Sequence, residues 1–243
     1  MISVGFKTDR GVCRSGNEDS IFIMPDKQIY MVADGVGGHN SGELASRMTV
    51  GYMAQFVALH PLDGIKSDIE LKEYFLQLFK GANDLVFKKS LSENNNRGMA
   101  TTAVLCYLRG PMAYVINVGD SRAYLVRDGV IRQVTKDHTL VQEMVDQGLI
   151  TPAEAEERTD KNMITRAIGG EMDVRPDFFA FEVYPGDTII MCSDGLYGEV
   201  EDEKMAAMAS STVAMHSLSK DLVDAANNHG GNDNISVVCI RIQ

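Results

Sequence analysis

The chain has 243 residues, 44% of them hydrophobic and 23% charged, which allows a sizeable core and excludes an intrinsically disordered protein. The net charge of −11 argues against nucleic acid as a ligand, because binding a phosphate backbone requires clustered lysine and arginine. No apolar run approaches the roughly 20 residues that cross a bilayer, and no signal peptide is evident, so we expect a cytoplasmic protein that does not bind membranes. The four cysteines form no CxxC pair, which favours free thiols in a reducing compartment.

Short β-type runs dominate the sequence, with two long helical stretches between them. The runs are rich in Val, Ile, Phe and Tyr and end at Gly, Asp or Asn turns. In chain order, the predicted strands are Ile2–Thr8, Ser20–Met24, Ile29–Ala33, Thr101–Leu108, Met112–Val118, Ala123–Arg127, Val130–Val134, Phe178–Val183, Thr188–Cys192 and Ile235–Ile242. Helices are predicted over Ser41–Leu59, Asp68–Leu91, Asp202–Ala209 and Ser217–His229. The Asp128-Gly129 pair predicts a tight type I′ hairpin between two of the strands.

The order of these elements predicts an α+β fold. Long helices between runs of consecutive strands favour a central antiparallel β-sandwich flanked by α-helices on both faces. Because no repeat, low-complexity tract or linker is present, we expect residues 1–243 to form a single domain. The segment 140–163 differs, with two short amphipathic helices predicted over Leu140–Gln147 and Pro152–Glu157. It is either an ordinary helical connection or a flap beside a site, and its length favours the flap.

Six acidic residues lie where apolar strands meet turns, several of them next to glycine. They are Glu18, Asp19, Asp34, Asp120, Asp194 and Asp233. If the six carboxylates gathered at one rim, positive charge would be needed to offset their repulsion, because like charges raise one another's pKa. Mg²⁺ and Mn²⁺, which prefer oxygen ligands, would supply it. Taken singly, however, an Asp-Gly pair is more often a turn than a metal ligand.

Competing chemistries can be excluded from the sequence. It contains no C-x5-R, HExxH, GxSxG or GxxxxGK[ST] motif, which removes cysteine phosphatases, zincins, α/β-hydrolases and P-loop proteins. The GxGxxG spacing fails at the glycines that follow Asp34. The five histidines form no close pair of ligands.

Eight short motifs follow one another along nearly the whole chain. They are RSGNED at 14–19, VADGVGGH at 32–39, GMATTA at 98–103, NVGDSR at 117–122, TKDHTLV at 135–141, ITRAIG at 164–169, SDGL at 193–196 and GNDNI at 231–235. In this order they resemble the PP2C-type, metal-dependent Ser/Thr protein phosphatases, in the compact bacterial form. Two departures stand out: Val36 occupies the position where eukaryotic relatives carry a histidine, and Ala100 replaces a glycine.

The resemblance implies a metal centre with two Mn²⁺ or Mg²⁺ ions and a third, weaker one. Asp34 would bridge two ions, and the Gly35 carbonyl would contact one of them. The remaining ligands implied are Asp194 and Asp233 for the first ion, Glu18 for the second, and Asp120 with Asp194 for the third. Asp19 is expected to orient a metal-bound water.

The resemblance also implies the reaction and its partners. Water activated between two ions would hydrolyse phosphoserine and phosphothreonine in proteins without a covalent phosphoenzyme. Arg14 would bind the phosphate in bidentate fashion. His39 would serve substrate binding or acid catalysis, or it would be an ordinary loop histidine. The implied partners are phosphorylated proteins and the Ser/Thr kinase that modifies them, and the expected state is a monomer. Two alternatives stay open, a non-catalytic phosphoprotein-binding or sensory module and an acidic structural protein.

Overall fold

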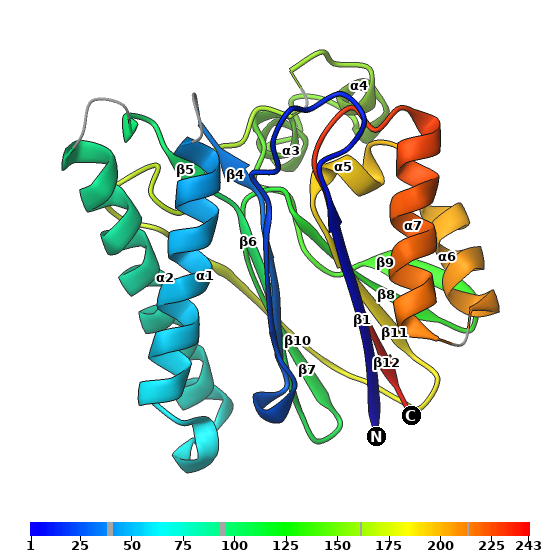
Figure 1. The fold of residues 1–243 in the computed structure, drawn as a ribbon, viewed down its shortest axis with the longest axis horizontal. Coiled ribbons are helices and arrows are strands. Elements are labelled where there is room, and N and C mark those ends of the chain that lie inside the picture. The colour runs from blue at the N-terminus through cyan, green and yellow to red at the C-terminus, as the bar shows by residue number, and fades with distance from the viewer. Residues whose placement is uncertain (38–40, 93–95, 161, 213) are drawn as a thin grey trace.

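The computed structural model describes residues 1–37, 41–92, 96–160, 162–212 and 214–243. Two five-stranded antiparallel sheets form its centre, with strand orders β1-β12-β11-β8-β9 and β10-β7-β6-β3-β2 (Figure 1). The strands are β1 Ile2–Asp9, β2 Ser20–Met24, β3 Ile29–Ala33, β4 Gly35–Val36, β5 Ala100–Thr101, β6 Ala103–Arg109, β7 Met112–Val118, β8 Arg122–Arg127, β9 Val130–Gln133, β10 Asp177–Glu182, β11 Thr188–Cys192 and β12 Ile235–Ile242. The helices are α1 Ser41–Leu59, α2 Asp68–Ser92, α3 Leu140–Asp146, α4 Pro152–Glu156, α5 Asp194–Tyr197, α6 Asp202–Ser211 and α7 Met215–His229, with 3₁₀ turns at Pro25–Lys27 and Leu62–Gly64.

The two sheets pack face to face because their strands are apolar on both sides. In β3, Tyr30 and Val32 point into the core between the sheets, whereas Met31 and Ala33 point outward into a second core with α1 and α2. A strand whose residues alternate between two cores reads as one continuous apolar run, since successive side chains point to opposite faces.

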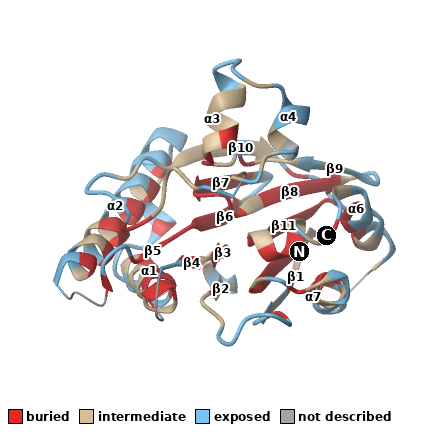
Figure 2. Cartoon of the chain, turned by 90° about the horizontal axis from the view of Figure 1, so that it is seen from above, coloured by how far each residue is buried: buried red, intermediate tan, exposed pale blue. Residues whose placement is uncertain are grey.

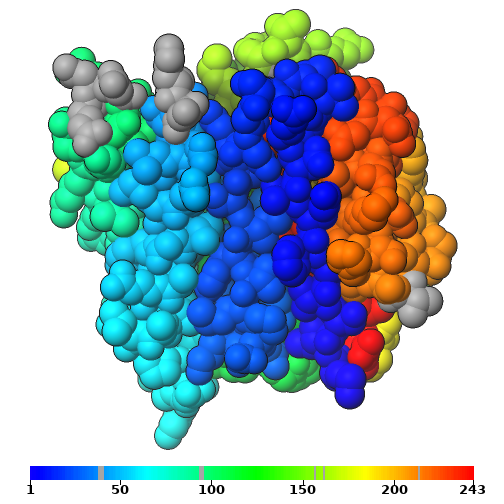
Figure 3. Space-filling model, in the orientation of Figure 1, coloured from blue at the N-terminus to red at the C-terminus, as the bar shows by residue number. Residues whose placement is uncertain are grey.

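Helices cover both outer faces of this sandwich. α1 and α2 pack on the sheet that contains β3, and α6 and α7 pack on the other, where Leu218 and Leu222 of α7 are fully buried. The resulting order is helix, sheet, sheet, helix, and in Figure 2 the buried strands lie between the two helical layers. Figure 3 shows the N-terminal strands on one face, between the α1–α2 layer and α7. The predicted α+β sandwich with helices on both faces is confirmed.

One predicted strand is wrong in its extent. The run Thr101–Leu108 does not form one strand, because it breaks at Thr102 into β5 and β6. At the break, Thr102 leaves its sheet ladder and donates its backbone N–H to the carbonyl of Asp34 at 2.8 Å. The short strand β5 pairs instead with β4, which the sequence did not predict. Through this break, β5 and Thr102 bind the backbone of Asp34, Gly35 and Val36, the segment that follows β3.

The hairpin and the helical insertion match their predictions. Asp128 and Gly129 have φ values of 51° and 79°, as a type I′ turn between β8 and β9 requires. The insertion contains α3 and α4, which project from the same end of the sandwich as the β7–β8 turn (Figure 1). We refer to residues 140–163, apart from the undescribed residue 161, as the flap. In the described part of the chain, no helix combines the length and the apolar character that crossing a membrane requires.

Candidate active site

Strand register brings the predicted acidic residues to one end of the sandwich. The end of β3 lies beside the start of β6 through the pair Val32 and Val104, and the end of β7 lies beside the same start through Val118 and Ala103. In the other sheet, Ser193 directly follows β11 and donates its N–H to the carbonyl of Ser236, near the start of β12. All the turns that carry the acidic residues therefore open on the same side.

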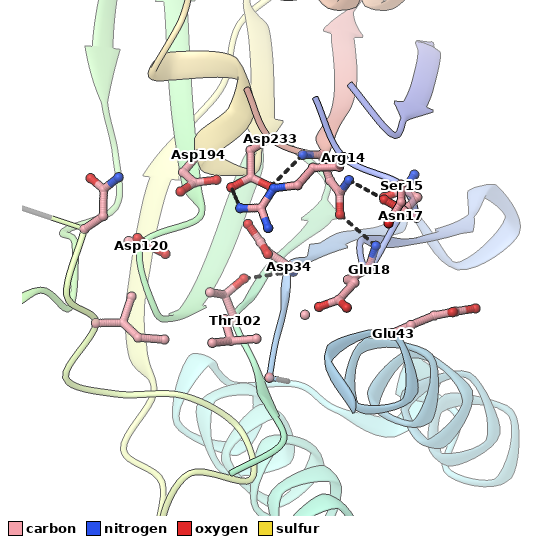
Figure 4. Close-up of a pocket in the computed structure, with 17 residues that line it drawn as sticks. Arg14, Ser15, Asn17, Glu18, Asp34, Glu43, Thr102, Asp120, Asp194 and Asp233 are labelled. Carbon is pink, nitrogen blue, oxygen red and sulfur yellow. Dashed lines mark hydrogen bonds and ion pairs between the residues drawn. The ribbon is translucent and has the colours of Figure 1, made fainter. Parts of the chain in front are cut away.

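A pocket of about 350 Å³ lies between these turns (Figure 4). Its lining includes all predicted site residues that the structure describes, except Asp19: Arg14, Glu18, Asp34, Gly35, Asp120, Asp194 and Asp233. In Figure 4, Asp120 and Asp194 lie on one side of the pocket and Glu18 and Glu43 on the other. His39, predicted as a substrate-binding or acid residue, lies outside the described residues.

Asp34 is held by two adjacent threonines. Its N–H donates to Oγ1 of Thr102 at 3.0 Å, and its carbonyl accepts from the hydroxyl of Thr101 at 2.8 Å. The Thr102 hydroxyl also lies 2.6 Å from that of Ser121, next to Asp120 in the sequence. One buried threonine thus fixes the backbone of Asp34 and the turn that carries Asp120.

Glu18 and the Gly35 carbonyl converge over the first turn of α1. A Cβ built on Gly42 would lie 2.1 Å from Oε2 of Glu18 and 2.6 Å from the oxygen of Gly35. Any side chain there would displace both oxygens, so only glycine permits this approach. The backbone of Glu18 is fixed as well, because its carbonyl accepts a hydrogen bond from the Ser46 hydroxyl at 2.6 Å.

Asp19 is buried and does not line the pocket. Its Oδ2 accepts the Ser193 hydroxyl at 2.8 Å, and the same hydroxyl oxygen accepts the Ser236 N–H at 3.0 Å. Oδ1 of Asp19 and Oδ1 of Asp194 are buried without a hydrogen-bond partner among the described residues. Buried carboxylate oxygens without partners are costly, which points to a ligand that completes them.

Arg14 and Asp233 form an ion pair at the mouth of the pocket. Nη2 of Arg14 donates to Oδ2 of Asp233 at 2.7 Å, and the arginine side chain is 56% exposed. The neighbouring Asn234 ties the loop between β1 and β2 together: its side chain accepts from the Glu18 N–H and donates to the Gly16 carbonyl, each at 2.8 Å. This loop therefore presents both Arg14 and Glu18 to the pocket.

Burial, with a smaller contribution from mutual repulsion, raises the pKa values of these carboxylates. Burial is the largest cause for Asp34, whose pKa lies well above the usual range, and Asp19 and Asp194 add to it by repulsion. Burial, with repulsion from Asp194, raises the pKa of Asp120 to about 7, and burial raises that of Asp19 to about 7. For Glu18 the pKa is raised too, mainly by burial. In the absence of cations the site favours bound protons.

These oxygens fit divalent cations that retain water. Among the described residues, no three acidic, histidine or cysteine side chains are already close enough to enclose one ion. The carboxylates are instead spread along the pocket, which suits Mg²⁺ and Mn²⁺, because Mg²⁺ in particular keeps several water ligands. The partnerless oxygens of Asp19 and Asp194 and the approach of Glu18 to Gly35 over Gly42 agree with such ions.

Some residues that shape the pocket carry no predicted role in the sequence. Thr102 and Gly42 touch the acidic residues directly, and Asn234 holds the loop of Arg14. The only sequence signal for Thr102 is its place in a motif before a strand. Gly42 and Asn234 act through residues remote in the chain, which no local pattern reveals.

Comparison with known proteins identifies relatives over the whole chain. Residues 14–229 match the family model described as protein phosphatase 2C. The serine/threonine phosphatase stp of Listeria innocua is 35% identical over 239 residues, which cover 97% of this chain and 94% of that protein. PstP of Mycobacterium tuberculosis is 34% identical over 232 residues, which cover 96% of this chain and 43% of PstP.

Solved structures agree with this relationship. The serine/threonine phosphatase of S. agalactiae superimposes with a TM-score of 0.91 at 31% identity, and each chain covers 100% of the other. The catalytic domain of PstP, solved in complex with two manganese ions, has a TM-score of 0.84 at 32% identity and covers 99% of this chain and 97% of that one. The chain therefore belongs to the protein phosphatase 2C family, as its ordered motifs predict.

Proposed function

We propose that the protein hydrolyses phosphoserine and phosphothreonine in proteins, using two Mn²⁺ or Mg²⁺ ions and, at a weaker site, a third. The observation that carries the proposal is the pocket itself, in which strand-end carboxylates and one arginine meet in a chain of the protein phosphatase 2C family. The manganese complex of the related PstP catalytic domain supports the choice of ion.

The proposed ligands are those that the resemblance to the protein phosphatase 2C family implies, and all of them line the pocket. Asp34 lies between the two groups of acidic residues and would bridge two ions, with the Gly35 carbonyl contacting one of them. Asp194 and Asp233 would hold the first ion and Glu18 the second, while Asp120 with Asp194 would hold the third. When bound, such ions lower the pKa of a water molecule, which supplies the nucleophile, and neutralise phosphoryl oxygens.

Protein side chains bind and orient the remaining partners. Arg14 would donate to the phosphate, since its planar guanidinium suits bidentate contact with phosphate oxygens and its side chain is largely exposed. Asp19 has one buried oxygen without a partner among the described residues and would accept a hydrogen bond from a water held by the ions, which would orient that water. With Asp233 engaged by an ion, the guanidinium of Arg14 would be released toward the substrate.

Purified protein tests this proposal directly. A phosphothreonine peptide and an aryl phosphate are incubated with Mn²⁺, with Mg²⁺ or with EDTA at about pH 8. Hydrolysis of both substrates with either ion, and none with EDTA, is the expected result. Binding of the phosphopeptide without turnover would instead support a non-catalytic recognition module. A calorimetric titration without divalent-ion binding would leave only an acidic structural protein.

The wider role follows from this activity. We propose that phosphoproteins and a Ser/Thr kinase that modifies them are its partners, and that the chain acts as a monomer and a single domain, with the flap at residues 140–163. His39 stays a prediction for substrate binding or acid catalysis. The cytoplasmic location stays a prediction as well.

A further inference from the structure

A second cleft opens beside the proposed catalytic pocket. It has a volume of about 570 Å³ and lies between the flap and the start of α5 and α6. Asp194 and Asn162 line both the cleft and the pocket. A peptide whose phosphate occupied the pocket would therefore place neighbouring side chains in the cleft, because an extended chain advances only about 3.3–3.6 Å per residue.

The arginine in this cleft is not available to bind an anion. The guanidinium of Arg122 donates from Nε and Nη2 to Oδ2 of Asp137 at 3.0 and 2.6 Å, and from Nη1 to the Tyr124 hydroxyl at 3.0 Å. One face of the guanidinium is covered by Tyr197, whose ring centre lies 3.7 Å from its central carbon. Charge and donors of Arg122 are thus satisfied within the protein.

A second carboxylate, that of Asp202, lines the cleft and is not part of the ion pair between Arg122 and Asp137. Asp202, the first residue of α6, is only partly buried, and the charge of Arg122 and the hydroxyl of Tyr124 both favour its ionised form. Among the described charged residues of the cleft, Asp194 belongs to the proposed metal site and Asp137 is paired with Arg122. Asp202 is the acidic group left to meet a substrate.

The opposite wall, contributed by the flap, is aliphatic. Val141 and Val145 of α3 and Pro152 and Ala155 of α4 line it. A carboxylate facing an aliphatic wall matches lysine and arginine, whose methylene stems pack on apolar surface while the charged end stays free. An acidic side chain would meet Asp202 with like charge, and an apolar one would desolvate that carboxylate without replacing its lost water contacts.

We propose that the cleft between the flap and α5–α6 binds an arginine or lysine side chain of the phosphoprotein, within about two residues of the phosphorylated one. This inference rests on the proposed phosphatase function and names the class of substrate: phosphosites flanked by basic residues. The net charge of −11 acts in the same direction, because it attracts basic segments over longer range.

Three phosphothreonine peptides test the inference. They are identical except that the residues flanking phosphothreonine are arginine, glutamine or glutamate. We expect kcat/KM to fall from the arginine to the glutamine peptide by roughly tenfold, the effect of losing one charge-assisted contact, and to fall further with glutamate. In Asp202→Asn the preference for arginine over glutamine should shrink to about twofold or less, while turnover of an aryl phosphate is unchanged.

Two further variants act as controls. Glu203→Gln removes the same charge from the next residue of α6, which is exposed and does not line the cleft, and it should retain the full preference. Gln142→Lys places a positive charge on the flap side of the cleft and should favour the glutamate peptide.

The outcomes separate this inference from the phosphatase function. Equal kcat/KM for all three peptides, or an arginine preference that persists in Asp202→Asn, would overturn the basic-residue cleft while leaving the enzyme a phosphatase. If neither the peptides nor the aryl phosphate are hydrolysed, the proposed function fails and the inference falls with it.

Discussion

Gly42, in the first turn of α1, is a residue whose importance comes from what it lacks. The oxygens of Glu18 and Gly35 lie within 2.6 Å of the position that its Cβ would occupy. We expect Gly42→Ala to push these oxygens apart and to raise the Mn²⁺ concentration for half-maximal activity by roughly tenfold to a hundredfold, as changes that displace metal ligands do. Titration of phosphatase activity with Mn²⁺ measures this effect.

Gly51 supplies the matched control on the same helix. It is exposed, and a Cβ there would meet nothing within 4 Å. Gly51→Ala should stabilise the protein by about 0.5–1 kcal/mol, because alanine loses less backbone entropy in a helix, and leave the Mn²⁺ dependence unchanged. Equal Mn²⁺ dependence in Gly42→Ala and wild type would rule out the role given to Gly42.

Arg14 is paired with Asp233, yet its exposure leaves it free to exchange partners. If it binds the substrate phosphate, Arg14→Ala should lower kcat/KM by roughly tenfold to a hundredfold, since a hydrogen bond to a charged group contributes about 1.5–3 kcal/mol. Arg14→Lys should recover only part of the loss, because an ammonium cannot make a bidentate contact. Steady-state kinetics on a phosphothreonine peptide provides the measurement.

Arg109 offers a comparison at the far end of β6. It also pairs with an aspartate, Asp68, at 2.6 Å, but it lies away from the pocket. Arg109→Ala should therefore leave kcat/KM near the wild-type value. A loss of activity equal to that of Arg14→Ala would show that general electrostatics, not phosphate binding, explains the effect.

Among the elements, the break between β5 and β6 is the feature most closely tied to the site. Thr102 sits in this break, fully buried, and accepts the N–H of Asp34. Thr102→Val removes the acceptor and leaves that N–H unpaired, which should lower the free energy of unfolding by about 1–3 kcal/mol. Because Asp34 would then shift, we expect kcat/KM to fall by roughly tenfold to a hundredfold.

Thr102→Ser separates the hydroxyl from the methyl group. The serine keeps the acceptor for Asp34 and the contact with Ser121, so most of the activity should remain. Chemical denaturation and kinetics on both variants supply the measurements. If the serine variant lost as much activity as the valine variant, packing by the threonine methyl, not the hydrogen bond, would account for the effect.

The same break marks the limit of what the sequence could predict. Strands such as Ser20–Met24 and Ile29–Ala33 were predicted with their observed bounds, because apolar runs and turn residues are local signals. α5 was missed, since a helix of four residues that begins at Asp194-Gly195 looks like a turn. β5 was merged with β6, because the bond from Thr102 to Asp34 joins residues far apart in the chain.

The site likewise has features that the sequence could predict and features that it could not. Positions of the acidic residues at strand ends were readable, and the ordered motifs gave each a role to be tested. The close approach of the Glu18 and Gly35 oxygens to Gly42 depends on tertiary structure, and so do the contacts of Asn234 with Glu18 and Gly16. Neither composition nor periodicity reveals them. Motif order predicted which residues meet, whereas packing determines how closely they meet.

For the molecule as a whole, the acidic pocket links folding stability to protons and ions. Without ions, the pKa values of Asp19 and Asp120 are raised to about 7, mainly by burial, so the folded state binds protons that the unfolded state releases. A group with a raised folded pKa contributes stability at low pH, and this contribution is lost as pH rises through the folded value. The ion-free protein should therefore lose stability as pH rises through about 7.

Ions should reverse this loss, because cations and protons compete for the same oxygens. At about pH 8, Mg²⁺ or Mn²⁺ at a hundred times its dissociation constant should stabilise the fold by about 2.7 kcal/mol, a rise in Tm of roughly 5–10 °C. At about pH 5.5 the rise should be much smaller, since bound protons must first be released. Thermal unfolding with ions and with EDTA, at both pH values, measures the difference.

His138 provides a reason to compare ions and EDTA at each pH instead of following one curve. Burial, with repulsion from Arg166, lowers its pKa, so its contribution to stability is lost as pH falls and opposes that of the carboxylates. His138 does not line the pocket, but its Nδ1 accepts the N–H of Gly119, next to Asp120, so the effect of ions has to be compared with EDTA at the same pH. Asp120→Asn removes one titrating carboxylate and should make the ion-free protein less sensitive to pH. An equal rise in Tm at both pH values would contradict the coupling between protons and ions, and with it the placement of the ions among these carboxylates.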